Sequence, residues 1–191
     1  MEACRAVSQR AAQTLKWAEQ NNLSLLTIAL DHLTLGRAAL YAAIIENSAS
    51  EKSAIRTQHS ALDQAVSGLR RAGQQDELPK ALLTRAWLRH LSGARSYEQA
   101  GSDSAQSDLD EAWDIATRGG MRLFQADINL YRARLFGTRN DERGKINEES
   151  YPWESPEADL AAAEKLINEC GYHRRDEELA DAKRMILKPK V

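Results

Sequence analysis

The chain has 191 residues, of which 42% are hydrophobic, and a formal net charge of −2 at pH 7. This length fits one domain with a buried core, so we expect a single domain over residues 1–191. The near-neutral charge argues against nucleic-acid and membrane partners, and two lone cysteines, Cys4 and Cys170, argue against a disulfide framework and for a cytoplasmic location.

The composition predicts helix throughout, because only four prolines and ten glycines interrupt the chain. No segment alternates between polar and apolar residues with a period of two, so no strand is expected. Start signals are Ser48-x-x-Glu51 as a capping box, Asp76 to Pro79 as a helix start, and Ser155-Pro156-Glu157 as a cap followed by proline. The expected helices are 4–20, 24–46, 52–72, 78–92, 103–118, 121–136, 156–170 and 174–187.

The most apolar stretch, Leu23 to Ile45, is long enough to span a bilayer. Asp31, His32 and Arg37 lie in its middle, where the hydrocarbon core would penalise them. We therefore interpret it as a buried helix.

A short pattern, Leu-x-Arg-Ala-x-Leu, begins at Leu35, Leu83 and Leu130, with a decayed copy at Leu179. The four leucines are 48, 47 and 49 residues apart, which indicates a repeat of about 48 residues. The copies lie in what we name A helices.

A second pattern lies between the copies, in what we name B helices, and each ends on a glycine suited to a left-handed cap: Gly73, Gly120 and Gly171. Residues 8–20 fit this pattern loosely, with Asn21-Asn22 as the stop, so the chain begins on a B helix. The small and apolar positions of the pattern are expected to be buried between helices; they are Leu62, Ala65, Leu69, Leu109, Ala112, Leu160, Ala163 and Ile167.

The longest interruption is a charged loop over residues 137–155, which ends on Tyr151-Pro152-Trp153. Loops of this length are functional or disordered. We expect the first half to be mobile and the second half to be docked by Tyr151 and Trp153.

Repeated antiparallel helix pairs with small residues at their contacts resemble a tetratricopeptide-like array. We therefore predict an all-α fold, an α-solenoid of antiparallel helix pairs. The strings ALDHLTLGRAAL (29–40), GLRRAGQQDELPKALLTRA (68–86), DLDEAWDIATRGGMRLFQADINLYRARL (108–135) and YPWESPEADLAAAEKLINECGYHRRDEELADA (151–182) resemble the C-terminal repeat arrays of bacterial STAND, or NACHT-like, signalling ATPases. The resemblance covers roughly residues 15–187 and implies a recognition arm for proteins.

The sequence departs from that family in two ways. Its repeat is about 14 residues longer than the usual unit of about 34 and lacks the Trp-Leu-Gly-Tyr pattern. No Gly-x-x-x-x-Gly-Lys-[Ser/Thr] occurs, so the ATPase engine is absent from this chain. Because the chain begins on a B helix, either residues 1–20 cap the array or the chain is the end of a longer polypeptide.

The best candidate site is a row of arginines, Arg37, Arg85 and Arg132, which occupy the same place in three A helices. Such a row would bind an acidic or phosphorylated peptide. The alternative is that Asp63 and Asp110, in fixed register on the B helices, consume the arginines in structural salt bridges.

The four tryptophans pose the same question of packing against binding. We interpret Trp17 and Trp113 as packing residues, and Trp87 and Trp153 as candidate anchors for a partner.

No catalytic, cofactor or metal site is predicted. The four histidines are scattered, and carboxylate pairs such as Glu148-Glu149 lie in charged surroundings that would not raise a pKa. The leading hypothesis is a non-catalytic scaffold that binds a protein or peptide. The alternatives are a self-association module and, last, a helical enzyme with its site under the 137–155 loop.

Overall fold

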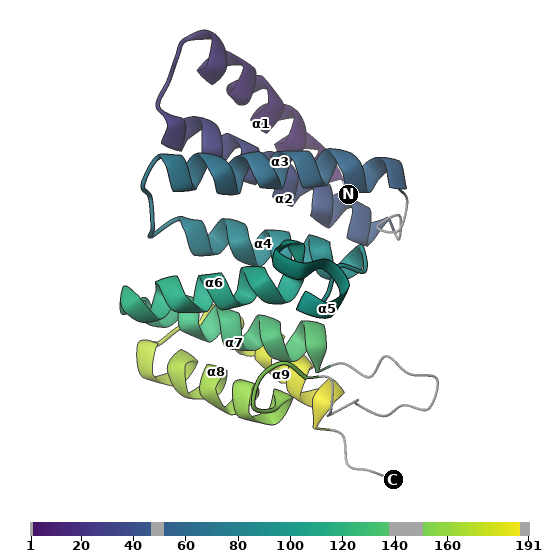
Figure 1. Cartoon of the computed structure of the whole chain (residues 1–191), viewed down its shortest axis with the longest axis vertical. Coiled ribbons are helices and arrows are strands. Elements are labelled where there is room, and N and C mark those ends of the chain that lie inside the picture. The colour runs from purple at the N-terminus through teal and green to yellow at the C-terminus, as the bar shows by residue number, and fades with distance from the viewer. Residues whose placement is uncertain (1, 47–51, 138–150, 188–191) are drawn as a thin grey trace. The chain divides into compact units, whose positions relative to one another are not determined.

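The computed structural model describes residues 2–46, 52–137 and 151–187 (Figure 1). Over these residues the protein is all-α, with nine α-helices, short 3₁₀ turns and no strand. The all-α prediction is therefore confirmed. Two expectations, the capping box at Ser48 and the mobile first half of the loop, fall on residues 47–51 and 138–150, outside this description.

Two compact units divide the chain, residues 1–111 and 112–191, with the boundary inside α6 (Ala105–Arg118). The first unit holds α1 (Glu2–Gln20), α2 (Leu25–Ile45), α3 (Lys52–Arg71), α4 (Leu78–Leu91), the short α5 (Tyr97–Ala100) and the 3₁₀ turn η1 (Gly101–Asp103). The second holds α7 (Arg122–Phe136), α8 (Pro156–Cys170), the 3₁₀ turn η3 (His173–Arg175) and α9 (Asp176–Ile186).

All eight expected helices are present, with ends within two residues of those expected. The sequence reading missed α5 and η1, which lie in the interruption between α4 and α6. A side chain stabilises this short helix: Gln99 Oε1 accepts from the backbone N–H groups of Arg95 at 3.0 Å and Ser96 at 3.3 Å.

The B helices end in the same way. Gly73, Gly120 and Gly171 have φ between 60° and 71°, and Asn22 takes the left-handed conformation at the end of α1. The next residue then bonds back five positions, from Gln74 N to Leu69 O at 3.1 Å, for example. The predicted glycine caps and the asparagine stop are confirmed.

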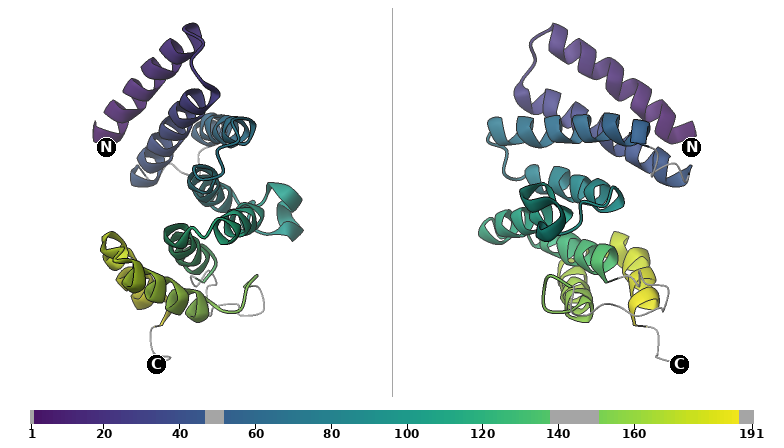
Figure 2. Two further views of the ribbon diagram at one scale, coloured as in Figure 1. Left: turned by 90° about the vertical axis from the view of Figure 1, so that its left-hand side faces the viewer. Right: turned by 45° about the vertical axis from the view of Figure 1, so that its right-hand side comes forward.

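In the first unit α2 packs between α1 and α3, and α3 contacts α4 (Figure 2). Close approach of α2 and α3 depends on Gly36, where an added Cβ would lie 2.7 Å from Leu62 Cδ2. Leu62, Ala65 and Leu69 of α3 are fully buried. Small residues therefore set the distance between these two helices.

In the second unit α7 and α8 pack together and α9 closes the core. Ser155 caps α8 by accepting from Ala158 N at 3.0 Å, and Pro156 follows it as predicted. All eight residues expected at helix contacts, in both units, are at most 1% exposed.

Among the described residues, α2 is the one helix long and apolar enough to cross a membrane. It carries Asp31 and Arg37, and it lies against α1 and α3. These contacts agree with its interpretation as a buried helix.

Candidate functional site

Arg37 connects two A helices of the first unit. From α2, its guanidinium donates to Thr84 Oγ1 at 3.0 Å and to the carbonyl oxygen of Lys80 at 3.2 Å, both on α4. Thr84 also donates to the Lys80 carbonyl at 2.8 Å. Arg37 therefore holds α2 against α4.

Arg85 is 7% exposed and its donors are occupied by two carboxylates. It donates to Asp108 Oδ2 and Oδ1 at 3.1 and 2.7 Å, and to Asp63 Oδ1 at 3.0 Å. One turn along α4, Arg89 donates to the same Asp108 Oδ1 at 3.1 Å and to Asp103 Oδ1 at 3.0 Å. The result is a buried Arg85–Asp108–Arg89 network joining α4 to the start of α6.

Burial and charge act in opposite directions on this network. Burial raises the pKa of Asp108, whereas the guanidiniums of Arg85 and Arg89 act to lower it. Burial alone would lower the pKa of Arg85, but its hydrogen bonds and charge interactions with Asp108 and Asp63 outweigh burial and raise it. Because guanidinium groups do not deprotonate in proteins, two fixed positive charges face Asp108 and offset part of the effect of burial on its pKa.

Arg132 lies between two indole rings in the second unit. Its guanidinium carbon is 4.8 Å from the ring centroid of Trp113 and 4.5 Å from that of Trp153. Trp153 also contacts the edge of Phe136 at a centroid distance of 5.1 Å. Beside it, the Tyr151 hydroxyl donates to Asp159, and Tyr151 is buried. Docking by Tyr151 and Trp153 is thus confirmed for the described end of the loop, residues 151–155.

The remaining tryptophans differ from each other. Trp87 is half-buried and lies 5.8 Å, ring to ring, from Tyr41 on α2. Trp17 is 59% exposed, so its interpretation as a packing residue is wrong. The buried stripe of α1 runs through Ala11 and Ala18, and Trp17 lies one position, or about 100°, off it.

The three arginines at equivalent repeat positions therefore have three different environments. In the first unit Arg37 and Arg85 both join helices, as the bracing interpretation requires, and in the second Arg132 is stacked between aromatic rings. Asp63 is one predicted partner of Arg85, but the other carboxylate is Asp108. Asp110 instead accepts from the Tyr97 hydroxyl at 3.3 Å.

Asp108 was missed by sequence reasoning, although a signal for it exists. Arg85 and Arg89 are one turn apart on a helix whose other central residues are mostly apolar, with Thr84 as a polar exception. Two buried cations on one face require a shared carboxylate nearby.

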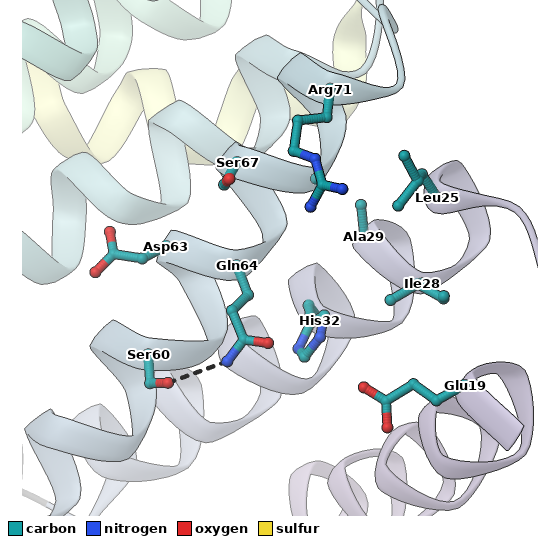
Figure 3. Close-up of a pocket in the computed structure, with 11 residues that line it drawn as sticks. Glu19, Leu25, Ile28, Ala29, His32, Ser60, Asp63, Gln64, Ser67 and Arg71 are labelled. Atoms are coloured by element: carbon teal, nitrogen blue, oxygen red, sulfur yellow. Dashed lines mark hydrogen bonds between the residues drawn. The ribbon is translucent and has the colours of Figure 1, made fainter. Parts of the chain in front are cut away.

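A groove of about 470 Å³ lies on the first unit, where α1, α2 and α3 meet (Figure 3). Helix α1 contributes Glu19, helix α2 contributes Leu25, Ile28, Ala29 and His32, and helix α3 contributes Ser60, Asp63, Gln64, Ser67, Gly68 and Arg71. It combines an apolar floor with polar and charged walls. That combination suits a ligand with both apolar and polar groups.

The sequence contains a weak signal for this groove. Ser60, Gln64, Ser67 and Arg71 follow helical spacing on α3, beside the buried stripe. Such a polar stripe is usually a solvated face, so spacing alone could not identify a groove.

His32 is the least exposed polar residue of the groove, at 8%. Its Nδ1 is buried and has no hydrogen-bond partner among the described residues. Burial lowers its pKa, while the charges of Glu19 and Asp31 act to raise it. The imidazole is therefore neutral at pH 7 and retains hydrogen-bonding capacity.

No protein-family model, curated protein or solved structure matches this chain. Among the residues described here, no group of three or more His, Cys, Asp or Glu side chains is arranged to hold a metal ion. The geometry of the groove is thus the basis on which a function can be argued.

Proposed function

We propose that this chain is a non-catalytic protein-interaction module built as a tetratricopeptide-like α-solenoid. Its near-constant repeat interval and equivalent helix ends support this proposal. The resemblance to the repeat arrays of bacterial signalling ATPases suggests that it serves as a recognition arm in such a protein.

The groove on α1, α2 and α3 is the observation that carries the proposal. Its floor contains Ile28 and Ala29, and its α3 wall contains Ser67 and Gln64. Repeat proteins bind along surfaces that consecutive helices form together, and a peptide backbone needs both hydrogen-bonding walls and apolar contact. We propose that a peptide segment of a partner protein binds here.

The arginine row is not part of this binding surface. The guanidiniums of Arg37 and Arg85 donate to neighbouring helices, so a peptide would have to break those hydrogen bonds in order to bind them. For this reason we place the candidate binding surface at the groove and not at the arginine row.

Selection of a random peptide library on the purified protein tests the proposal. Peptides that bind wild type should lose at least tenfold in affinity for Ser67→Trp, which fills the groove from an exposed position on α3. Gln13→Trp, at an exposed position of α1 outside the groove, is the matched control and should bind as wild type does. If no selected peptide is sensitive to Ser67→Trp, the groove is not a peptide site.

A second candidate function, self-association, is favoured by an exposed tryptophan on α1. Trp17 is 59% exposed and lies about 100° away from the buried stripe of Ala11 and Ala18. Solvent-exposed apolar side chains of this size favour association between copies. Light scattering across a concentration series should then show a mass that rises with concentration for wild type and stays monomeric for Trp17→Glu. A constant monomeric mass for both proteins would exclude it.

A further inference from the structure

Two opposite charges on the walls of the groove lack partners within the described residues. Arg71 projects its guanidinium into the groove from α3, and Glu19 projects its carboxylate from α1 (Figure 3). Neither makes an ion pair with a described side chain. By contrast, the adjacent Arg70 makes an ion pair with Glu111. An arginine at this end of α3 can therefore find a partner within the fold, and Arg71 does not find one among the described residues.

The third charged residue of the groove is already committed. Asp63 accepts from Arg85 at 3.0 Å, so it already has a cationic partner within the fold. The groove charges without an ion-pair partner among the described residues are one cation on the α3 wall and one anion on the α1 wall.

Between these walls the floor is apolar, formed by Leu25, Ile28 and Ala29 of α2. His32 lies beside them with an unsatisfied nitrogen. A ligand that fills the groove must therefore bring an apolar group between its charged groups, with polar atoms near His32.

We infer that the groove recognises a peptide segment in which an acidic side chain faces Arg71, a basic side chain faces Glu19, and an apolar side chain lies between the two walls. This inference rests on the proposed peptide-binding function and specifies its partner. In an extended peptide successive side chains point to opposite sides, so one segment lying along the groove can address both walls.

The same charges argue against a polyanion. A nucleic acid or a run of phosphates could pair with Arg71, but it would place further negative charge against Glu19. Opposed wall charges select a ligand of mixed charge and penalise one of a single sign.

Charge reversal of the α3 wall tests the inference. The random peptide library is selected in parallel on wild type, on Arg71→Glu and on Arg10→Glu. Arg10 is an exposed arginine on α1 that does not line the groove, so its reversal changes the net charge by the same amount. Wild type and Arg10→Glu should enrich peptides with both an acidic and a basic residue, whereas Arg71→Glu should lose the acidic preference.

One selected peptide, synthesised with blocked termini, gives the quantitative measurement. Replacing its acidic residue by the amide should weaken binding to wild type about three- to fivefold, as expected for a partly exposed ion pair, and should have no effect on binding to Arg71→Gln. Replacing the basic residue of the peptide by a neutral one should likewise weaken binding to wild type and have no effect on binding to Glu19→Gln.

The outcomes separate this inference from the function on which it rests. In one outcome, the selected peptides are sensitive to Ser67→Trp, but Arg71→Glu and Arg10→Glu select peptides with the same charged residues. That outcome supports the peptide groove and overturns the inference. Peptides insensitive to Ser67→Trp overturn both.

Discussion

Arg85 donates two hydrogen bonds to the carboxylate of Asp108, at 2.7 and 3.1 Å, and both side chains are more than 90% buried. This pair joins α4 to the start of α6. The arginine in the middle of the predicted row is thus part of the internal support of the fold.

Replacing Arg85 with alanine should therefore destabilise the protein by about 3 kcal/mol, because it leaves a buried carboxylate with fewer partners. The matched control is Asp63→Ala, which removes the half-exposed partner of the same arginine and should cost at most about 1 kcal/mol. Chemical denaturation monitored by circular dichroism measures both. Equal stability of Arg85→Ala and wild type would contradict the bracing role.

The small residues at helix contacts provide a second test. Ala163 is fully buried, whereas Ala161 on the same helix is exposed to solvent. Ala163→Asp should cost several kcal/mol, about 3 or more, by burying an unpaired charge, and Ala161→Asp should cost less than about 1 kcal/mol. If thermal melting shows the two variants to be equally stable, the assigned register of α8 is wrong.

Helix positions and buried contacts followed from the sequence because they depend on local patterns. Apolar spacing located Leu62 and Ile167, and left-handed caps required glycine at Gly73 or Gly171. The roles of the arginines did not follow, because the repeat pattern is the same at Arg37, Arg85 and Arg132. Their contacts come from residues outside the pattern, such as Thr84, Asp108 and Trp153.

The groove is harder still to read from sequence. It depends on three helices meeting, and its residues, such as Glu19, His32 and Arg71, come from separate stretches of the chain. Each taken alone resembles an ordinary surface or core position.

Stability should fall on mild acidification because of His90. Burial, with the nearby charge of Arg95, lowers the pKa of His90 to about 4 from an ordinary value near 6.5. The unfolded chain therefore takes up a proton before the folded one, and stability that is present above pH 6.5 is lost as the pH falls toward 4. The full difference corresponds to about 3 kcal/mol.

The measurement for this prediction is the free energy of unfolding at several pH values between 7 and 4.5. His90→Gln should reduce the slope in that range, although a part remains because burial also lowers the pKa of His32. An identical slope for wild type and His90→Gln would show that His90 does not titrate in this way.

Trp153 provides the last test, because it fixes the described end of the long loop, residues 151–155, onto the second unit. Its ring stacks on Arg132 and contacts the edges of Phe136 and Tyr151. Trp153→Leu removes one face of the Arg132 sandwich and both ring contacts, and should cost about 2 kcal/mol. Trp17→Leu makes the same substitution at an exposed position and should change stability by less than about 0.5 kcal/mol.

Limited proteolysis should cut Trp153→Leu faster than Trp17→Leu between residues 137 and 155, since the docked end is then released. If Trp153→Leu has the same stability and the same cleavage rate as Trp17→Leu, the contacts of Trp153 do not hold the loop. That result would favour the interpretation of Trp153 as an anchor for a partner.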